Sequence, residues 1–302
     1  MIFTEIRTDL ALEMREKETE NAARRDAGEI DGVVFSEKRE GNVCVSVIDV
    51  VNENGEKKLG KPRGRYVTVA FGDVANMTYG EYENICGVLA ENILSLAKMA
   101  AGDVKSVLVC GLGNRRFSAD AVGVISAEKT VVTRHVKNSD EKLFEAAGFF
   151  DICAIMPGVA AQTGIETLEL VRSAANEAKP DLIIVVDALA ARKAERLGCT
   201  VQLTDTGISP GSGVGNCRGA INKDTTGVPT VAVGVPTVID SGTLIRDVLD
   251  EAGASCDIKI PCGMFVCPKD VDVKAELVGS MIGYAINLAF HKNMSIPEMM
   301  IM

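Results

Sequence analysis

The sequence predicts an α/β fold in which a largely parallel β-sheet lies between two layers of helices, with antiparallel strands at its N-terminal end. From residue 106 onward, short apolar runs alternate with helical patterns, which is typical of a buried parallel sheet covered on both faces. Before that point, residues 31–36, 43–51 and 65–71 are rich in Val, Ile, Tyr and Thr and are separated by polar turns containing glycine. The 302 residues show no internal repeat and no low-complexity linker, so we predict one domain.

The elements follow one another in a regular order. The first predicted helix covers residues 80–100, where Ile85, Leu89 and Ile93 fall on one face. The later elements are a strand at 106–110, a helix containing Glu166 to Glu177, a strand at 182–186, a helix near 188–197, strands at 200–204 and 230–235, a helix near 244–249 and a last helix at 273–290.

The composition limits the classes of protein to which the chain can belong. The net charge is −10, with 42 acidic and 32 basic residues, which argues against a general nucleic-acid binder. The basic residues at 57, 58, 61, 63 and 65 are interpreted as a solvated turn between two strands, with a patch for an acidic partner as the alternative. The nine scattered cysteines form no CxxC pair, which predicts reduced thiols in a cytoplasm-like compartment. Neither a secretory signal nor a membrane span is predicted.

Four acidic side chains lie beyond the carboxyl ends of predicted strands. They are Asp120, Asp187, Asp205 and Asp240. Ligands of open α/β sheets bind at the carboxyl ends of the strands, although each carboxylate could also be a helix N-cap. Asp187 stands out because it ends a wholly apolar strand and is predicted to enter a helix. Two carboxylates held close together can share one proton, so that one activates water while the other stays protonated.

Other hydrolytic chemistries fit the sequence poorly. The two histidines, His135 and His291, form no HExxH motif, which excludes a zincin. Ser209 lies in a G-x-S-x-G pattern, but Pro210 follows it and lacks the backbone N–H that a nucleophile elbow needs for its oxyanion hole. The glycine-rich residues 211–215 resemble a dinucleotide loop only loosely. We therefore predict neither a metal nor a cofactor.

Motifs along almost the whole chain resemble the spore germination protease family. They are RTDLALE (7–13), GRYVTV (64–69), GLGN (111–114), SADAVG (118–123), PGVAAQTGIET (157–167), PDLIIVVDALAAR (180–192), TDTGISPGSGVGN (204–216), GVPTVID (234–240) and CPKDVD (267–272). PGVAAQTGIET and TDTGISPGSGVGN are long and specific, which makes the resemblance strong.

The resemblance implies an activity and a site. Members of this family are atypical aspartic endopeptidases, homotetrameric and made as zymogens, that degrade small acid-soluble spore proteins in the cytoplasm of the spore. The catalytic pair falls on Asp120 and Asp187, and the self-cleaved bond joins Asp9 to Leu10. Residues 1–9 would then be a pro-segment and residues 10–302 a single peptidase domain. Residues 8–13 resemble the Thr-Glu-aromatic/aliphatic-Ala-x-Glu sequence that the family cuts in its substrates. Neither nucleic acid nor a membrane is an expected partner.

Substrate-binding residues are expected in the loops around the pair. The candidates are Asn114, Arg192, Asp205, Ser209 and Asn216. We expect Arg192, on the predicted helix after Asp187, to attract an acidic residue that precedes the cut bond.

Two other functions are possible. GLGN followed by Asp120 and Gly123 also resembles the opening motif of hydrogenase maturation endopeptidases, whose fold is thought to be related. The TDTGISPGSGVGN loop and the RTDLALE junction favour the germination protease. A non-enzymatic acidic binding protein would leave the carboxylates at the strand ends unexplained.

Overall fold

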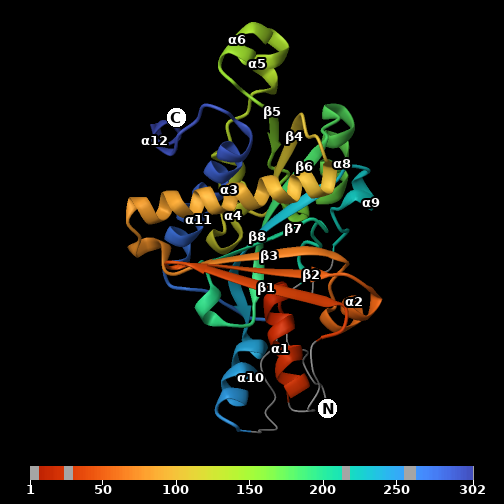
Figure 1. Cartoon of the computed structure of the whole chain (residues 1–302), viewed down its shortest axis with the longest axis vertical. Coiled ribbons are helices and arrows are strands. Elements are labelled where there is room, and N and C mark those ends of the chain that lie inside the picture. The colour runs from red at the N-terminus through yellow and green to blue at the C-terminus, as the bar shows by residue number, and fades with distance from the viewer. Residues whose placement is uncertain (1–6, 24–29, 213–217, 255–262, 302) are drawn as a thin grey trace.

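The fold is built on one nine-stranded sheet (Figure 1). The computed structural model describes residues 7–23, 30–212, 218–254 and 263–301. Along the sheet the strands lie in the order β1-β2-β3-β7-β8-β6-β4-β5, and β9 pairs with β8. Their bounds are β1 Val33–Glu40, β2 Val43–Val50, β3 Gly64–Phe71, β4 Ser106–Gly111, β5 Asp151–Ile155, β6 Leu182–Ala191, β7 Thr200–Thr204, β8 Thr230–Asp240 and β9 Phe265–Val266.

The pairing confirms the predicted fold class. Strands β5, β4, β6 and β8 are parallel neighbours and form the centre of the sheet. Strands β1, β2 and β3 are antiparallel and join the sheet through β7. Strand β7 is antiparallel to both β3 and β8, so its carboxyl end points opposite to the carboxyl ends of the parallel strands.

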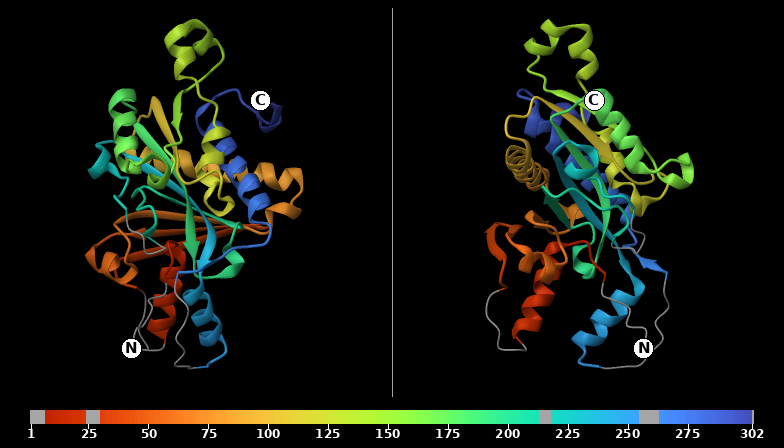
Figure 2. Two further views of the ribbon diagram at one scale, coloured as in Figure 1. Left: turned by 180° about the vertical axis from the view of Figure 1, so that it is seen from behind. Right: turned by 90° about the vertical axis from the view of Figure 1, so that its right-hand side faces the viewer.

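Helices cover both faces of the parallel strands (Figure 2). Helices α3 (Tyr79–Ala101), α4 (Val122–Glu128) and α11 (Val271–Phe290) pack together on one face, and α8 (Thr167–Ala178) packs on the other. Side chains of β6 alternate between the two cores, with Ile184 in the first and Ile183 in the second. Burial on both faces explains why this strand reads as a continuous apolar run.

Four other helices extend beyond the two ends of the sheet. Helices α1 and α10 project from one end, and α5 and α6 stand at the other (Figures 1 and 2). No helix in the described part of the chain is both long and apolar enough to cross a bilayer. The bounds are α1 Ala11–Ala23, α2 Glu53–Leu59, α5 Arg134–Ser139, α6 Glu141–Ala146, α7 Ala160–Thr163, α9 Lys223–Thr226, α10 Ser241–Glu251 and α12 Ile296–Ile301, with 3-10 turns η1 Val74–Asn76, η2 Ser118–Asp120 and η3 Ala194–Arg196.

The predicted helix near residues 188–197 is wrong. Strand β6 continues from Asp187 to Ala191, because β8 also continues, to Asp240, and pairs with it along this stretch. The alanine-rich ALAA sequence favours a helix locally, and pairing with a distant strand overrides that preference. Only the short turn η3 follows the strand.

The turn predicted between β2 and β3 is also wrong, because it contains α2. Asn52 caps the start of this helix by accepting a hydrogen bond from the backbone N–H of Gly55, and Gly60 ends it with φ 62°. The sequence patterns did not predict strand β5. The cysteines within the described ranges are free thiols, and Cys86 and Cys110 are buried.

Candidate active site

Asp187 lies where one edge of β6 becomes free. Strand β4 ends at Gly111, and the last bond on that side runs from the N–H of Leu112 to the carbonyl of Val186, at 2.8 Å. Asp187 follows immediately and pairs on its other side with Gly234 of β8. Its side chain is only 6% exposed. The free edge of β6 beyond it is therefore open to another chain segment.

Asp120 is held by the turn that precedes α4. Gly113 adopts φ 100°, and a Cβ at this position would lie 2.1 Å from the carbonyl oxygen of Asp120. That same oxygen accepts a hydrogen bond from the N–H of Asn114 at 2.9 Å. Thr237 of β8 donates its hydroxyl to the carbonyl of Ala119 at 2.6 Å. The second glycine of GLGN is therefore required for the turn that carries Asp120.

The two aspartates line one cavity. Its volume is about 260 Å³, and its other walls include Leu112, Gly158 and Arg218. A water molecule occupies about 30 Å³ of liquid, so the cavity has room for several. Asp120, from the turn η2, and Asp187, from within β6, are therefore brought to the same cavity.

Burial raises both pKa values. Desolvation raises the pKa of Asp120 to about 6, against the opposing effects of the Asn114 N–H and of Arg218. Desolvation also raises the pKa of Asp187 well above its usual range, and the neighbouring charge of Asp120 adds to the effect. The charge of Asp9 acts in the same direction, while the N–H of Ala188 acts against it. Near neutral pH the pair can therefore hold one proton.

Asp9 binds to the free edge of β6. Its N–H donates to the carbonyl of Ala190 at 2.9 Å, and its carboxylate accepts from the N–H of Ala190 at 2.9 Å. Ser212 donates its hydroxyl to the other carboxylate oxygen at 2.8 Å. Asp9 also lines the cavity that contains Asp120 and Asp187. Ala190 lies three residues beyond Asp187, roughly 10 Å along the strand at ~3.3 Å per residue.

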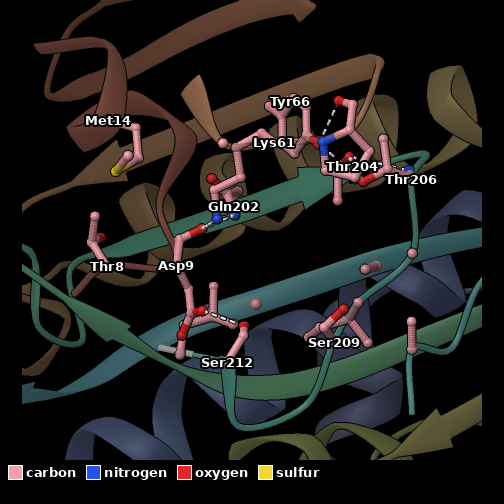
Figure 3. Close-up of a pocket in the computed structure, with 18 of the residues that line it drawn as sticks. Thr8, Asp9, Met14, Lys61, Tyr66, Gln202, Thr204, Thr206, Ser209 and Ser212 are labelled. Carbon is pink, nitrogen blue, oxygen red and sulfur yellow. Dashed lines mark hydrogen bonds between the residues drawn. The ribbon is translucent and has the colours of Figure 1, made fainter. Parts of the chain in front are cut away.

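The residues on both sides of the Asp9–Leu10 bond are held in place by hydrogen bonds or by burial. The carbonyl oxygen of Asp9 accepts from Lys61 Nζ at 2.8 Å and from Gln202 Nε2 at 3.1 Å (Figure 3). Gln202 Oε1 in turn accepts from the N–H of Ala11 at 2.7 Å. The Leu10 side chain is fully buried, in a cluster with Leu189, Ala191, Leu197 and Ile239. One glutamine thus binds the main chain before and after Leu10.

The structure places the other predicted residues as follows. Asn114 uses its side-chain oxygen to accept from Gln162 at 3.0 Å, and its backbone supports Asp120. Ser209 lines a pocket that is also lined by Asp9, without a described contact to Asp9. Asn216 lies outside the described residues.

Arg192 does not contact Asp9, the acidic residue before the predicted cut bond. It follows β6 directly and is not on a helix. Its side chain is buried against Asp247, with Nε 2.5 Å from the carboxylate. The carboxylate of Asp9 is held by Ala190 and Ser212 instead.

Two of the four strand-end carboxylates have structural roles. Asp205 accepts from the N–H of Arg65 at 2.8 Å, and the antiparallel direction of β7 carries it away from the pair. Asp240 caps helix α10 by accepting from the N–H of Thr243 at 3.0 Å. The N-cap alternative is therefore correct for Asp240.

Several residues of the site were not predicted from the sequence. They are Gln202, Ser212 and Arg218, while Lys61 was noted only within the basic cluster at residues 57–65 and Glu13 only as the last residue of the RTDLALE motif. Gln202 offered a signal, since it is a polar residue within an otherwise buried short strand. The others lie in loops or on α1, where sequence alone does not show what they face. No group of three or more His, Cys, Asp or Glu in the described part of the chain could hold a metal ion.

Comparisons with known proteins agree on one family. The family model described as germination protease matches residues 10–252. The germination protease of Clostridium tetani is 37% identical over 322 residues, covering 97% of this chain and 98% of the relative. That of Clostridium perfringens strain SM101 is 38% identical, with 97% of both chains covered. That of Oceanobacillus iheyensis is 41% identical over 248 residues, covering 82% of this chain and 67% of the relative.

A solved structure is similar at a lower level. The NiFe hydrogenase maturation protease HycI from Thermococcus kodakarensis is 19% identical, and the match covers 63% of this chain and 97% of that one. The TM-score of 0.34 is too low for this similarity to bear on function.

Proposed function

The chain belongs to the germination protease family, and from that premise we propose how this peptidase works and what it cuts. We propose that it is an aspartic endopeptidase whose acid–base pair is Asp120 and Asp187. We propose further that it is made as a zymogen, cuts itself between Asp9 and Leu10, and then degrades small acid-soluble spore proteins. Residues 1–9 would be the pro-segment, and residues 10–302 the peptidase domain.

One observation supports the aspartic mechanism above all. Two carboxylates from separate segments line the same cavity, and burial raises the pKa of each. An ordinary surface carboxylate, or one that only caps a helix, would have no reason to retain a proton near neutral pH.

The pKa values assign a role to each carboxylate. Asp187, whose pKa is the more strongly raised, keeps its proton, while Asp120 is largely ionised above about pH 6. Asp120 then takes a proton from a water molecule, whose oxygen attacks the peptide carbonyl carbon. Asp187 donates its proton to the leaving nitrogen as the C–N bond breaks, and the two carboxyl groups exchange protonation states. The positive charge of Arg218 favours the ionised carboxylate.

The zymogen proposal rests on the intact junction. Asp9 occupies the β6 edge next to the pair and blocks a substrate from that edge. The Asp9–Leu10 bond itself lies along β6 from Asp187 rather than directly over it. Self-cleavage therefore requires the junction to move along β6 or to reach the pair of another copy. By family resemblance, we propose a homotetramer that acts in the cytoplasm of the forespore or spore core.

The test is direct. Purified protein is incubated with a small acid-soluble spore protein, and the cut bonds are mapped by mass spectrometry. We expect cleavage after an acidic residue and before a large apolar one, as at Asp9–Leu10. Failure to cut that substrate under any condition that yields processed protein would contradict the proposed substrate. Cutting at unrelated sequences would contradict the proposed specificity.

A further inference from the structure

The buried carboxylate of Glu13 depends on a donor from the proposed pro-segment. Glu13 is only 1% exposed. Its Oε2 accepts from the N–H of Arg192 at 2.7 Å and from the hydroxyl of Thr8, and its Oε1 accepts from the N–H of Lys193 at 3.0 Å. Desolvation raises the pKa of this carboxyl, and these donors oppose the rise. A carboxylate at this depth is stable only while its donors remain, so the loss of Thr8 would have to be compensated.

The hydroxyl of Thr8 also links Glu13 to the nitrogen of Leu10. It donates to Oε2 of Glu13 and accepts from the N–H of Leu10 at 3.1 Å. Leu10 directly precedes α1, and Glu13 is the third residue of that helix. A glutamate at this position commonly reaches back to the backbone nitrogen of the residue before the helix. One hydroxyl therefore stands between a nitrogen and a carboxylate that helix geometry otherwise brings together.

Hydrolysis of the Asp9–Leu10 bond changes both partners of this hydroxyl. The reaction consumes one water and leaves an α-carboxylate on Asp9 and, near neutral pH, an α-ammonium group on Leu10. Thr8 then belongs to the separate fragment. The new ammonium group lies at the N-terminal end of α1, where the helix dipole disfavours a positive charge. It therefore needs a nearby anion at the moment when Glu13 loses the donor that Thr8 supplied.

Contacts that the cut does not remove keep Leu10 in its place. Its side chain is fully buried in an apolar cluster at the end of β6. The next residue, Ala11, donates its N–H to Gln202 Oε1 at 2.7 Å. Further along α1, Glu16 accepts from Arg196 Nη2 at 2.6 Å. The new N-terminus is therefore held close to Glu13 by groups on both sides of it.

Two other cations face the same carboxylate. Arg196 Nε lies 3.7 Å from Oε1 of Glu13, which is too far for a hydrogen bond. The charge of Lys61 also acts on Glu13, but its Nζ binds the carbonyl oxygen of Asp9 at 2.8 Å in the intact protein. Neither cation is placed at Oε2, the oxygen that Thr8 vacates.

We propose that Glu13 is the binding site for the α-ammonium group that self-cleavage creates on Leu10. This ion pair takes the place of the Thr8 hydroxyl and ties the new N-terminus to the turn after β6, whose N–H groups hold the same carboxylate. The proposal rests on the proposed function, because only a cut between Asp9 and Leu10 creates this group.

The test titrates the α-amine of Leu10. Protein that has processed itself is pulsed with acetic anhydride at a series of pH values and digested with trypsin, and acetylation of residues 10–15 is measured by mass spectrometry. These residues, LALEMR, contain no lysine, so the α-amine is their only reactive amine. The reference is the free peptide LALEMR. A hydrogen bond between two charged groups predicts that the pH of half-maximal labelling lies about one to two pH units higher in the protein.

Salt and two variants identify the partner. Sodium chloride at about 1 M should leave the shift in place, because a contact pair is screened less than the general field of a protein with net charge −10. Glu13→Gln should bring the pH of half-maximal labelling to within about half a pH unit of the peptide. Glu20→Gln is the matched control. Glu20 lies two turns further along α1 and faces Arg192 at 3.9 Å, so the shift should persist.

The outcomes separate the two proposals. Processed protein that labels with the pH dependence of the free peptide would overturn the ion pair and leave Arg196 or Lys61 as the partner of Glu13, while self-cleavage stands. A shift that salt abolishes, or that Glu13→Gln leaves in place, would also overturn it. Absence of processed protein under every condition would overturn the proposed function, and the ion pair with it. Because the titration uses the unchanged protein, it decides the matter even if Glu13→Gln is not processed.

Discussion

Replacing Asp120 by asparagine should abolish cleavage and at the same time stabilise the intact protein near pH 7.5. Loss of one acid–base group lowers a rate typically by ~10²–10⁴-fold, and we expect about 10³-fold or more here. Asp187→Asn should have the same effect on cleavage. The double variant should be no slower than either single one, because the two carboxylates act as a unit.

The stabilisation follows from the raised pKa. Burial raises the pKa of Asp120 from 3.8 to about 6, so between these values the folded protein binds more protons than the unfolded chain. The stability that this group contributes is therefore present at low pH and is lost as the pH rises through about 6. A shift of about 2 units corresponds to roughly 3 kcal/mol at 1.36 kcal/mol per unit. Since Asp120 is partly exposed, solvent screening reduces this to about 1–2 kcal/mol.

Asparagine removes the free-energy cost of burying an ionised carboxylate, because asparagine does not ionise. Thermal unfolding followed by circular dichroism should show Tm raised by about 2–8 °C near pH 7.5, from about 2–4 °C per kcal/mol in a large domain. The gain should vanish near pH 3.5, where the aspartate is protonated in both states. Asp187→Asn should show a gain of the same sign, because its pKa is also raised by burial.

The control residue, Asp181, lies just before the other end of the same strand. Asp181 precedes β6 and accepts from the N–H of Lys105 at 2.9 Å and of Ser106 at 3.0 Å. Asp181→Asn keeps an acceptor oxygen there and should stay active. Unprocessed protein of each variant must be compared with unprocessed wild-type protein. Near-normal cleavage by both active-site variants, or inactivity with a lower Tm at both pH values, would refute the reasoning.

Three further predictions concern maturation, pH and inhibitors. Processed protein should start at Leu10 in N-terminal mass analysis, since the substrate-like bond follows Asp9, and a different first residue would contradict the proposed junction. The value of kcat/KM for a peptide should be bell-shaped with pH, rising through about pH 6 as Asp120 ionises and falling at higher pH as Asp187 loses its proton; a flat profile would speak against the pair. Chelators and serine-directed reagents should leave the rate unchanged, because the described residues form no metal-ligand group and Pro210 follows Ser209; inactivation by a chelator that zinc reverses would exclude the mechanism.

The sequence was sufficient to predict that Asp120 and Asp187 lie close together, which their shared cavity confirms, but not what surrounds them. Position beyond a predicted strand selected four carboxylates, because ligands of open α/β sheets bind at the carboxyl ends of the strands. The family resemblance narrowed these four to Asp120 and Asp187. The same rule failed for Asp205, since the direction of β7 cannot be read from its five residues. Lys61 and Gln202 lie more than 50 and 190 residues from Asp9 along the chain, so only the folded sheet brings them to its carbonyl oxygen.

The wrong prediction with the largest consequence was the end of β6, which the sequence pattern placed at residue 186 and which lies at Ala191. A helix after Asp187 would have turned Arg192 back toward the pair and left the sheet edge short. Because β8 continues to Asp240, β6 runs on to Ala191 with one paired edge and one free edge. Four residues of free edge bind Asp9 and bury Leu10, and the turn that follows binds Glu13. The difference between the lengths of β4 and β6 therefore creates the binding edge, and this difference depends on long-range pairing that no local sequence pattern encodes.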